Sequence, residues 1–217
     1  MPRDISQVVY ALARVEPSGL NLLGSGFAIS DDKIATAFHV VGPDDRNLAM
    51  IMPRVSSILD YQDTSDQRVN AVSLSMYAAD PIHDLCILQL PSSVSISFDY
   101  TLSSSDAVPP GTPVVTFGFP HANFGRMVLT QQIVHVGARI LIEAEGQKSK
   151  HIILNTQTRE GQSGGPVFDA ALRSVVAVVR GSYAPGGGGN IIIGGVDPAT
   201  LHQTTHAISA EYLLGMV

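Results

Sequence analysis

A serine among glycines is the clearest candidate nucleophile in this chain. Residues 161–168 read Gly-Gln-Ser-Gly-Gly-Pro-Val-Phe, so Ser163 lies on a tight turn that leads into an apolar strand. Acyl transfer needs a hydroxyl on a sharp turn whose backbone N–H groups converge on the developing oxyanion. Glycine permits such a backbone, so we expect the N–H groups of Gly161 and Ser163 to form an oxyanion hole. Gly164 and Gly165 would leave room for a substrate strand, although the same string also fits a plain tight loop.

A serine hydroxyl is a weak nucleophile unless a neighbouring base takes its proton. Among the seven histidines, His39 follows two apolar runs, at residues 24–29 and 34–37, which predict a hairpin. The hairpin would deliver His39 at the end of a strand, where it can serve as the general base. Taken alone, a histidine at this position is equally well read as a surface residue.

The base in turn needs a carboxylate that fixes its tautomer. Asp84 directly precedes the apolar strand predicted at residues 85–90 and is our candidate. Asp80 and Asp44 compete for this role, but Asp80 precedes a proline, which suits a turn, and Asp44 lies only five positions after His39. A carboxylate before an apolar strand can also be no more than a turn residue.

The elements that must position these residues are strands. Short apolar or alternating runs separated by Gly, Pro, Asp and Ser predict an all-β sandwich or barrel. A Ser- and Pro-rich stretch at residues 91–111 predicts a connector that divides the strands into two sets. Glycines within residues 185–190 predict a hairpin loop, and Ser209 is placed to cap a short C-terminal helix. The clearest strand runs are residues 7–15, 22–29, 33–37, 69–78, 85–90, 113–117, 127–136, 151–155, 174–180 and 190–194.

Composition excludes several classes of protein. The 217 residues include 45% hydrophobic and 15% charged residues, which is typical of a globular chain. A net charge of -6 without a Lys/Arg cluster argues against nucleic-acid binding, and no apolar run reaches membrane-spanning length. Cys86 is the single cysteine, so the fold needs no disulfide, and we read it as a buried small hydrophobe. Without a signal-like N-terminus, a complete gene product of this sequence is expected in the cytoplasm.

Four segments together resemble the trypsin-like peptidases, particularly bacterial HtrA-type and glutamyl-endopeptidase-like members without disulfides. The order His, Asp, Ser is that of the chymotrypsin class and differs from subtilisins and α/β-hydrolases. The resemblance covers the chain from about Leu20 to its end, with two departures: Phe38 replaces a small residue, and Gln162 replaces the aspartate that pairs with a new N-terminus in digestive members. The segments are residues 24–27, 36–41, 83–88 and 161–168.

The resemblance implies two six-stranded antiparallel β-barrels with a short C-terminal helix and an active site in the cleft between them. Residues 1–95 would form the first barrel, with His39 and Asp84, and residues 96–217 the connector, the second barrel with Ser163 and the helix. The implied activity is that of a serine endopeptidase acting on polypeptides through an acyl-enzyme, without a metal or cofactor. The sequence identifies neither a regulatory partner nor an oligomeric state.

By family position, the primary substrate pocket is walled by residues 157–162, 178–182 and 206–208. Members that cut after Lys or Arg have an aspartate six residues before the nucleophile, where this chain has neutral Gln157, so such cleavage is disfavoured. The small and branched side chains of Ala207 and Ile208 favour an aliphatic substrate residue before the scissile bond. A preference for an acidic residue is the second hypothesis, because Arg159, Arg180 and His206 could bind a carboxylate. The candidate pocket residues are Gln157, Thr158, Val179, Arg180, Ala207 and Ile208.

Three alternatives belong to other classes. A catalytically silent or partner-activated relative would keep the fold as a binding module, yet no member of the triad is missing here. A metal-binding protein is disfavoured because the remaining histidines show no HExxH or closely paired spacing. A cysteine-dependent protease is excluded at the nucleophile, since position 163 is serine.

Overall fold

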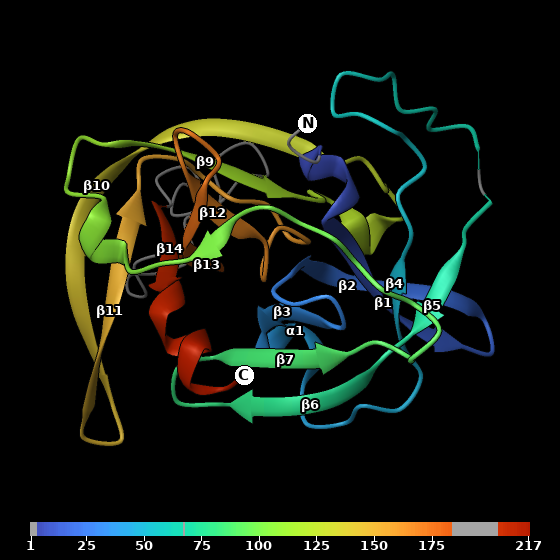
Figure 1. Ribbon diagram of the computed structural model, residues 1–217, viewed down its shortest axis with the longest axis horizontal. Helices are drawn as coiled ribbons and strands as arrows, with labels where there is room; N and C mark the ends of the chain where they lie inside the picture. The colour runs from blue at the N-terminus through green and yellow to red at the C-terminus, as the bar shows by residue number, and fades with distance from the viewer. Residues whose placement is uncertain (1–3, 67, 184–203) are drawn as a thin grey trace, which may run out of the picture.

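The first half of the chain forms a closed β-barrel (Figure 1). The computed structural model describes residues 4–66, 68–183 and 204–217. In the first sheet the strand order is β5-β4-β1-β2-β3-β7-β6. β5 and β6 are the two outermost strands of this sheet, paired with β4 and β7. Only Leu74 separates β5 from β6 along the chain, so these two strands together close the sheet into a barrel. The strands are β1 (Val9–Glu16), β2 (Gly19–Ala28), β3 (Lys33–Ala37), β4 (Leu48–Ile51), β5 (Ala71–Ser73), β6 (Ser75–Asp80) and β7 (Leu85–Gln89).

The second half repeats this architecture. Its sheet has the order β12-β9-β10-β11-β14-β13-β8, and an additional pairing between β12 and β13 closes six of its strands into a barrel. Closure satisfies the backbone hydrogen bonds that an open sheet edge would expose. The predicted all-β double barrel is therefore confirmed. The strands are β8 (Thr101–Leu102), β9 (Pro113–Gly118), β10 (Thr130–Ala144), β11 (Gln147–Leu154), β12 (Pro166–Asp169), β13 (Ser174–Tyr183) and β14 (Thr204–Ser209).

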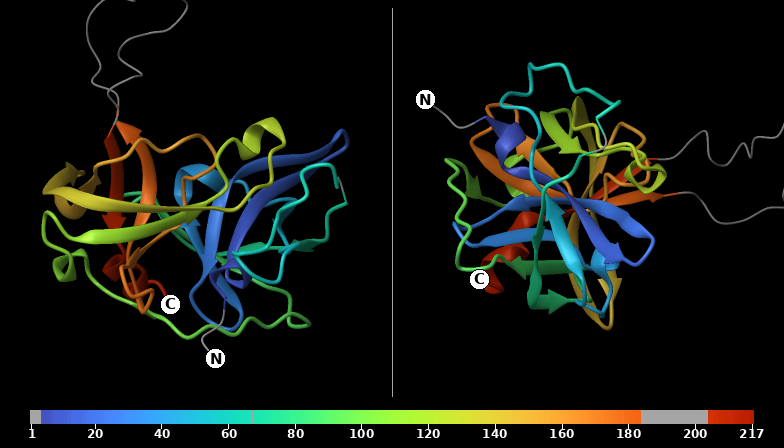
Figure 2. Two further views of the ribbon diagram at one scale, coloured as in Figure 1. Left: turned by 90° about the horizontal axis from the view of Figure 1, so that it is seen from above. Right: turned by 90° about the vertical axis from the view of Figure 1, so that its right-hand side faces the viewer.

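One large apolar cluster joins the two barrels, which lie side by side in Figure 2. Leu12, Ile34 and Leu85 of the first barrel belong to the same cluster as Phe117 and Phe168 of the second. Apolar burial of this kind is the main favourable term in folding. The shared cluster therefore holds the two barrels against each other and fixes the cleft that carries the candidate site.

Helical segments are short. The only α-helix in the described residues is α1 (Phe38–Val41), and the other helical segments among them are 3₁₀ helices. At the C-terminus a 3₁₀ helix, η5 (Ala210–Gly215), starts directly after Ser209, as expected, but the Ser209 hydroxyl does not cap it. That hydroxyl accepts a hydrogen bond from Ser105 N at 2.9 Å instead. No helix in the described part of the chain is long and apolar enough to cross a membrane.

Two predicted features, the loop at residues 185–190 and the strand at residues 190–194, lie outside the described residues. Elsewhere the predicted strands overlap the observed ones, and β3 has the predicted bounds. The run at residues 69–78 is divided into β5 and β6 at Leu74. This division matters for the architecture, because it lets one segment pair with both ends of the first sheet.

Candidate active site

Asp84 and His39 form the centre of the candidate site. Nδ1 of His39 lies 2.7 Å from Oδ2 of Asp84, and the backbone N–H of His39 donates to Oδ1 at 2.9 Å. The main-chain oxygen of Asp84 also accepts a hydrogen bond from Phe38 N at 3.0 Å. Ala37, at the N-cap of α1, has no side-chain cap, so Asp84 satisfies two N–H groups at the start of the helix. The same carboxylate thus caps the helix and orients the imidazole.

The competing aspartates lie elsewhere. Asp80 pairs with His83, whose Nδ1 is 2.6 Å from its Oδ2 and whose backbone N–H donates to its Oδ1. Asp44 forms an ion pair with Arg46, whose Nη2 lies 2.7 Å from Oδ2 of Asp44. Neither carboxylate contacts His39 in the described structure, so of the three candidate aspartates only Asp84 lies against this histidine.

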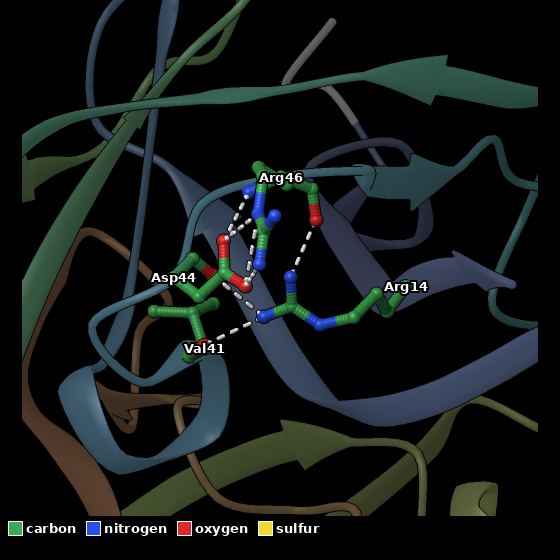
Figure 3. A network of polar contacts seen from close by, with 4 residues as sticks. All are labelled: Arg14, Val41, Asp44 and Arg46. Carbon is green, nitrogen blue, oxygen red and sulfur yellow. Dashed lines mark hydrogen bonds and ion pairs between the residues drawn. The ribbon is translucent and has the colours of Figure 1, made fainter.

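The side chain of Arg14 fastens the segment that follows His39 (Figure 3). Its guanidinium donates to the carbonyl oxygens of Val41, at 2.9 Å, and of Asp44, at 2.7 Å, and also to that of Arg46. Val41 is the last residue of α1. An arginine on β1 therefore ties the end of the His39 helix and the following loop to the body of the first barrel.

Phe38, a departure from the family pattern, is accommodated at the start of α1. Its ring is partly buried and packs against the large core cluster. His39 beside it keeps 47% of its side chain exposed. The phenylalanine therefore anchors the helix while the imidazole faces the cleft.

Ser163 lies between β11 and β12, and the backbone of Ser163 and Gly164 is hydrogen-bonded to both barrels. Ser25 N of the first barrel donates to Ser163 O at 2.9 Å, and Gly164 N donates to Val179 O at 2.8 Å. The Ser163 hydroxyl donates to the main-chain oxygen of Arg180 at 3.1 Å. In the described residues no hydrogen bond joins this hydroxyl to His39.

The glycines after Ser163 have a different role from the one predicted. A Cβ at Gly164 would collide with the main-chain oxygen of Ser25 and the hydroxyl of Thr36, and one at Gly165 with the main-chain oxygen of Phe117. Gly164 also has a φ of +81°, which favours glycine. Both positions need glycine because the chain's own neighbouring strands pass close to them. The expectation that these glycines leave room for a substrate strand is therefore wrong.

The segment that precedes Ser163 is held by side chains. Oε1 of Gln162 accepts a hydrogen bond from Arg159 N at 2.7 Å, and its Nε2 lies 3.3 Å from Oε1 of Gln132 on β10. The Ser25 hydroxyl donates to Gly161 O at 2.7 Å. The N–H groups of Gly161 and Ser163 donate to no acceptor among the described residues. Gln162 thus orders this loop where digestive relatives are expected to use an ion pair with the N-terminus.

Arg180 completes the surroundings of Asp84, and sequence reasoning missed this contact. Its Nε donates to Oδ2 of Asp84 at 3.0 Å, the same oxygen that faces His39. Burial alone would raise the pKa of Asp84, but the hydrogen bonds and charge of His39, with the charge of Arg180, lower it overall. A charged residue directly after the apolar run 175–179 was the available signal.

The remaining candidate pocket residues fall into two groups. Val179, Ala207 and Ile208 lie in the hydrophobic interior and are at most 1% exposed. Thr158 instead belongs to a polar cluster in which its hydroxyl lies 3.0 Å from that of Ser182, while its N–H donates to Thr205 Oγ1 at 3.0 Å. The walls seen here are therefore hydroxyl-lined, and the aliphatic lining inferred from Ala207 and Ile208 is not on the surface. Gln157 is half-buried.

Cys86 is fully buried on β7, as expected of a small hydrophobic residue. Burial raises the pKa of its thiol to about 12, which leaves it protonated and unreactive near neutral pH. It therefore does not compete with Ser163 as a nucleophile.

Two closed barrels with a paired His and Asp on one, and a half-buried Ser in a glycine-rich turn on the other, define the chymotrypsin class of serine peptidases. A family model described as "Trypsin-like peptidase domain" matches residues 24–178. The chain belongs to this family of trypsin-like peptidases and is a serine endopeptidase. No curated protein sequence matches it.

Solved structures show the same fold at low sequence identity. The active form of the Rv3671c protease from M. tuberculosis is 20% identical, with a TM-score of 0.68, and the match covers 98% of this chain and 80% of that one. The MamO protease domain from Magnetospirillum magneticum is 13% identical, with a TM-score of 0.69 over 98% and 97% of the two chains. The HtrA-type protease AlgW is 16% identical, with a TM-score of 0.68 over 98% of this chain and 63% of that one. The expected similarity to HtrA-type proteases is confirmed.

Proposed function

We propose that this chain cleaves internal peptide bonds through an acyl-enzyme, with Ser163 as nucleophile, His39 as general base and Asp84 as the orienting carboxylate. The observation that carries the proposal is the 2.7 Å contact between His39 and Asp84. Because Nδ1 of His39 faces the carboxylate, its Nε2 is the nitrogen left to exchange a proton with Ser163.

Catalysis requires the Ser163 hydroxyl to leave the Arg180 main-chain oxygen, 3.1 Å away, and turn toward His39. A rotation about one side-chain bond between staggered positions is fast compared with turnover. The Rv3671c protease, which has a similar fold, has been solved in an active and an inactive form. We take the hydroxyl position seen here as a resting one.

In the acylation step, Ser163 Oγ attacks the substrate carbonyl carbon while Nε2 of His39 accepts the proton. The N–H groups of Gly161 and Ser163 donate to the oxyanion, and both lack acceptors among the described residues. Collapse of the tetrahedral intermediate breaks the C–N bond, and the proton on His39 passes to the leaving amine. A water molecule then attacks the acyl-enzyme by the same route, which releases the acid and restores Ser163.

Replacing the nucleophile tests this proposal. Ser163→Ala should lower the turnover of a mixed peptide library on the order of 10⁴-fold or more, because no other described residue can form the acyl-enzyme. Ser93→Ala, which changes an exposed serine in the connector, should retain wild-type turnover and serves as the matched control. Wild-type proteolysis by folded Ser163→Ala would rule the assignment out.

The assignment of the acid has its own internal control. Asp84→Asn should be much more damaging than Asp80→Asn or Asp44→Asn, since only Asp84 contacts His39. The reverse ranking would move the acid to another residue.

A second function, that of a catalytically silent binding module, is favoured by one observation. The Ser163 hydroxyl is bound to Arg180 O instead of His39. Such a module would bind polypeptides with equal affinity before and after Ser163→Ala and would cleave none of them.

A further inference from the structure

The proposed oxyanion hole consists of two peptide N–H groups, those of Gly161 and Ser163. In a trans peptide unit the C=O and N–H groups point in opposite directions, so a bond that holds one of them orients the other. The carbonyl oxygens of both units accept main-chain hydrogen bonds, from His121 N to Glu160 O at 2.7 Å and from Gly165 N to Gln162 O at 3.1 Å. The main chain therefore orients both donors from behind.

A third peptide unit, between Gly161 and Gln162, joins these two and is held by a side chain. The Ser25 hydroxyl donates to Gly161 O at 2.7 Å and accepts a hydrogen bond from Phe119 N at 3.1 Å. The backbone N–H of Ser25 donates to Ser163 O at 2.9 Å. Ser25 lies on β2 of the first barrel and is fully buried. One serine of the first barrel thus binds the main-chain oxygens of both residues that supply the oxyanion donors.

The chain at Phe119 packs directly behind the first donor. A Cβ at Gly161 would collide with Phe119 O and would lie 2.9 Å from Ala122 N, and the φ of Gly161 is +93°. Glycine is therefore required at position 161, but its backbone rotates freely unless neighbouring groups hold it. The Ser25 hydroxyl binds both segments, so it fixes the separation between Phe119 and Gly161.

We propose that Ser25 is a positioning residue for the oxyanion hole, and that its hydroxyl keeps the N–H groups of Gly161 and Ser163 pointed at one oxyanion. The inference rests on the proposed peptidase function and adds a side chain of the first barrel to the site. Ser25 acts through Gly161 and does not touch substrate. Without its hydroxyl, Gly161 O and Phe119 N lose this partner, and the peptide unit between the two donors is free to turn.

A pair of small esters tests the proposal without knowledge of the natural substrate. The probes are p-nitrophenyl acetate and p-nitrophenyl thionoacetate, in which sulfur replaces the carbonyl oxygen. Sulfur is a weak hydrogen-bond acceptor, so the oxyanion hole accelerates acylation by the oxygen ester far more than by the thionoester. The ratio of the two acylation rates, taken from the burst of p-nitrophenol, reports on the hole alone. A change in the nucleophile or its base affects both esters and cancels.

Ser25→Ala should lower this oxygen-to-sulfur ratio about tenfold, less than the roughly 10²- to 10³-fold loss that follows removal of an oxyanion-hole donor. With peptides it should lower kcat and leave KM nearly unchanged, because the hole acts in the transition state. Ser25→Cys retains a weak S–H donor and should give an intermediate ratio. It also provides the test if Ser25→Ala does not fold.

Ser209→Ala is the matched control for the loss of a buried hydroxyl. Ser209 is also fully buried, and its hydroxyl accepts a hydrogen bond from Ser105 N at 2.9 Å, outside the loop that precedes Ser163. This substitution should lower the free energy of unfolding, measured in urea, as Ser25→Ala does. It should leave the oxygen-to-sulfur ratio at the wild-type value.

Three results would overturn the inference: an unchanged ratio in folded Ser25→Ala, an equal loss of rate with both esters, or the same fall in ratio in Ser209→Ala. Any of these in an enzyme whose wild type cleaves peptides refutes the role of Ser25 alone. A folded wild type that gives no burst and cleaves no peptide refutes the proposed function and this inference together.

Discussion

At the scale of single residues, the carboxylate of Asp84 organises the site through three donors. His39 approaches it with both its backbone N–H and its ring, and Arg180 adds a third contact on Oδ2. With 8% of its side chain exposed, Asp84 depends on these partners to remain ionised. Stability from the lowered pKa of Asp84 is present above its unfolded-state pKa of about 3.9 and is lost as pH falls below it.

His151 gives the molecule a second, distinct pH dependence. It is 2% exposed on β11, its Nε2 lies 3.0 Å from the Ser149 hydroxyl, and its Nδ1 has no partner among the described residues. Burial, followed by the nearby charge of Arg180, lowers its pKa from 6.5 to about 4. The folded protein therefore disfavours the protonated ring, while the unfolded chain accepts a proton near pH 6.5.

We therefore predict a loss of stability as pH falls from about 6.5 toward 4. Between pH 7.5 and 5 this one group should lower the free energy of unfolding by about 2 kcal/mol. Urea unfolding at both pH values checks the prediction. His151→Gln should reduce the pH-dependent loss by about that amount, whereas His135→Gln, at an exposed position of β10, should leave it unchanged. Equal pH dependence in wild type and His151→Gln would contradict the role assigned to His151.

The contact of His39 with Asp84 and the turn that carries Ser163 could be predicted because residue type and local spacing carry most of their signal. The serine needs a glycine-rich turn, the histidine a strand end, and the aspartate a position before a buried strand, and all of these can be read from neighbouring residues. The contact of Arg180 with Asp84 could not be predicted, because it depends on a bulge in β13 and on a partner 96 positions away. The prediction of an aliphatic pocket lining was wrong for the same reason, since β14 turns Ala207 into the interior.

At the scale of elements, α1 is too short to hold its own position. Four residues form barely one helical turn, and such helices are unstable in isolation. Asp84 satisfies N–H groups at its start, and Arg14 binds the carbonyl oxygen of Val41 at its end. The position of His39 is thus set by residues from β1 and from the turn before β7.

Arg14→Ala should consequently harm both stability and activity. It removes three donors from backbone oxygens of the segment after His39, and we expect a loss of about 1–3 kcal/mol in the free energy of unfolding. It should also lower kcat more than it raises KM, because the helix that carries the base is loosened. Arg46→Ala is the control, since that side chain is 82% exposed and pairs only with Asp44 among the described residues. Equal effects of the two substitutions on kcat would show that Arg14 does not position α1.

Among the elements, strands bounded by turn residues could be predicted, and strands with weak patterns could not. β3 follows from the apolar run after Asp31 and Asp32. β4 (Leu48–Ile51) is only four residues long, and neither it nor β14 (Thr204–Ser209) is among the strand runs predicted from the sequence. Both strands gain their stability from pairing with distant segments, which local sequence does not display.

At the scale of the whole molecule, the site exists only because the two barrels are packed together. Ser163 is fixed to the first barrel through Ser25, and Arg180 reaches back from the second barrel to Asp84. The double barrel could be predicted through the resemblance to trypsin-like peptidases together with the independent signal of the connector. The directions in which side chains of the second barrel enter the cleft could not be predicted from the sequence. They follow from strand registers and bulges that form only in the folded chain.

Covalent labelling with a fluorophosphonate is the most direct measurement of whether Ser163 is an activated nucleophile. Folded wild-type protein should take up one label per chain, and peptide mapping by mass spectrometry should locate it on Ser163. The label should be absent from Ser163→Ala and strongly slowed in His39→Ala, because the hydroxyl depends on its base. A folded wild-type protein that stays unlabelled, or whose label maps to another serine such as Ser182, would contradict the catalytic assignment of Ser163, His39 and Asp84.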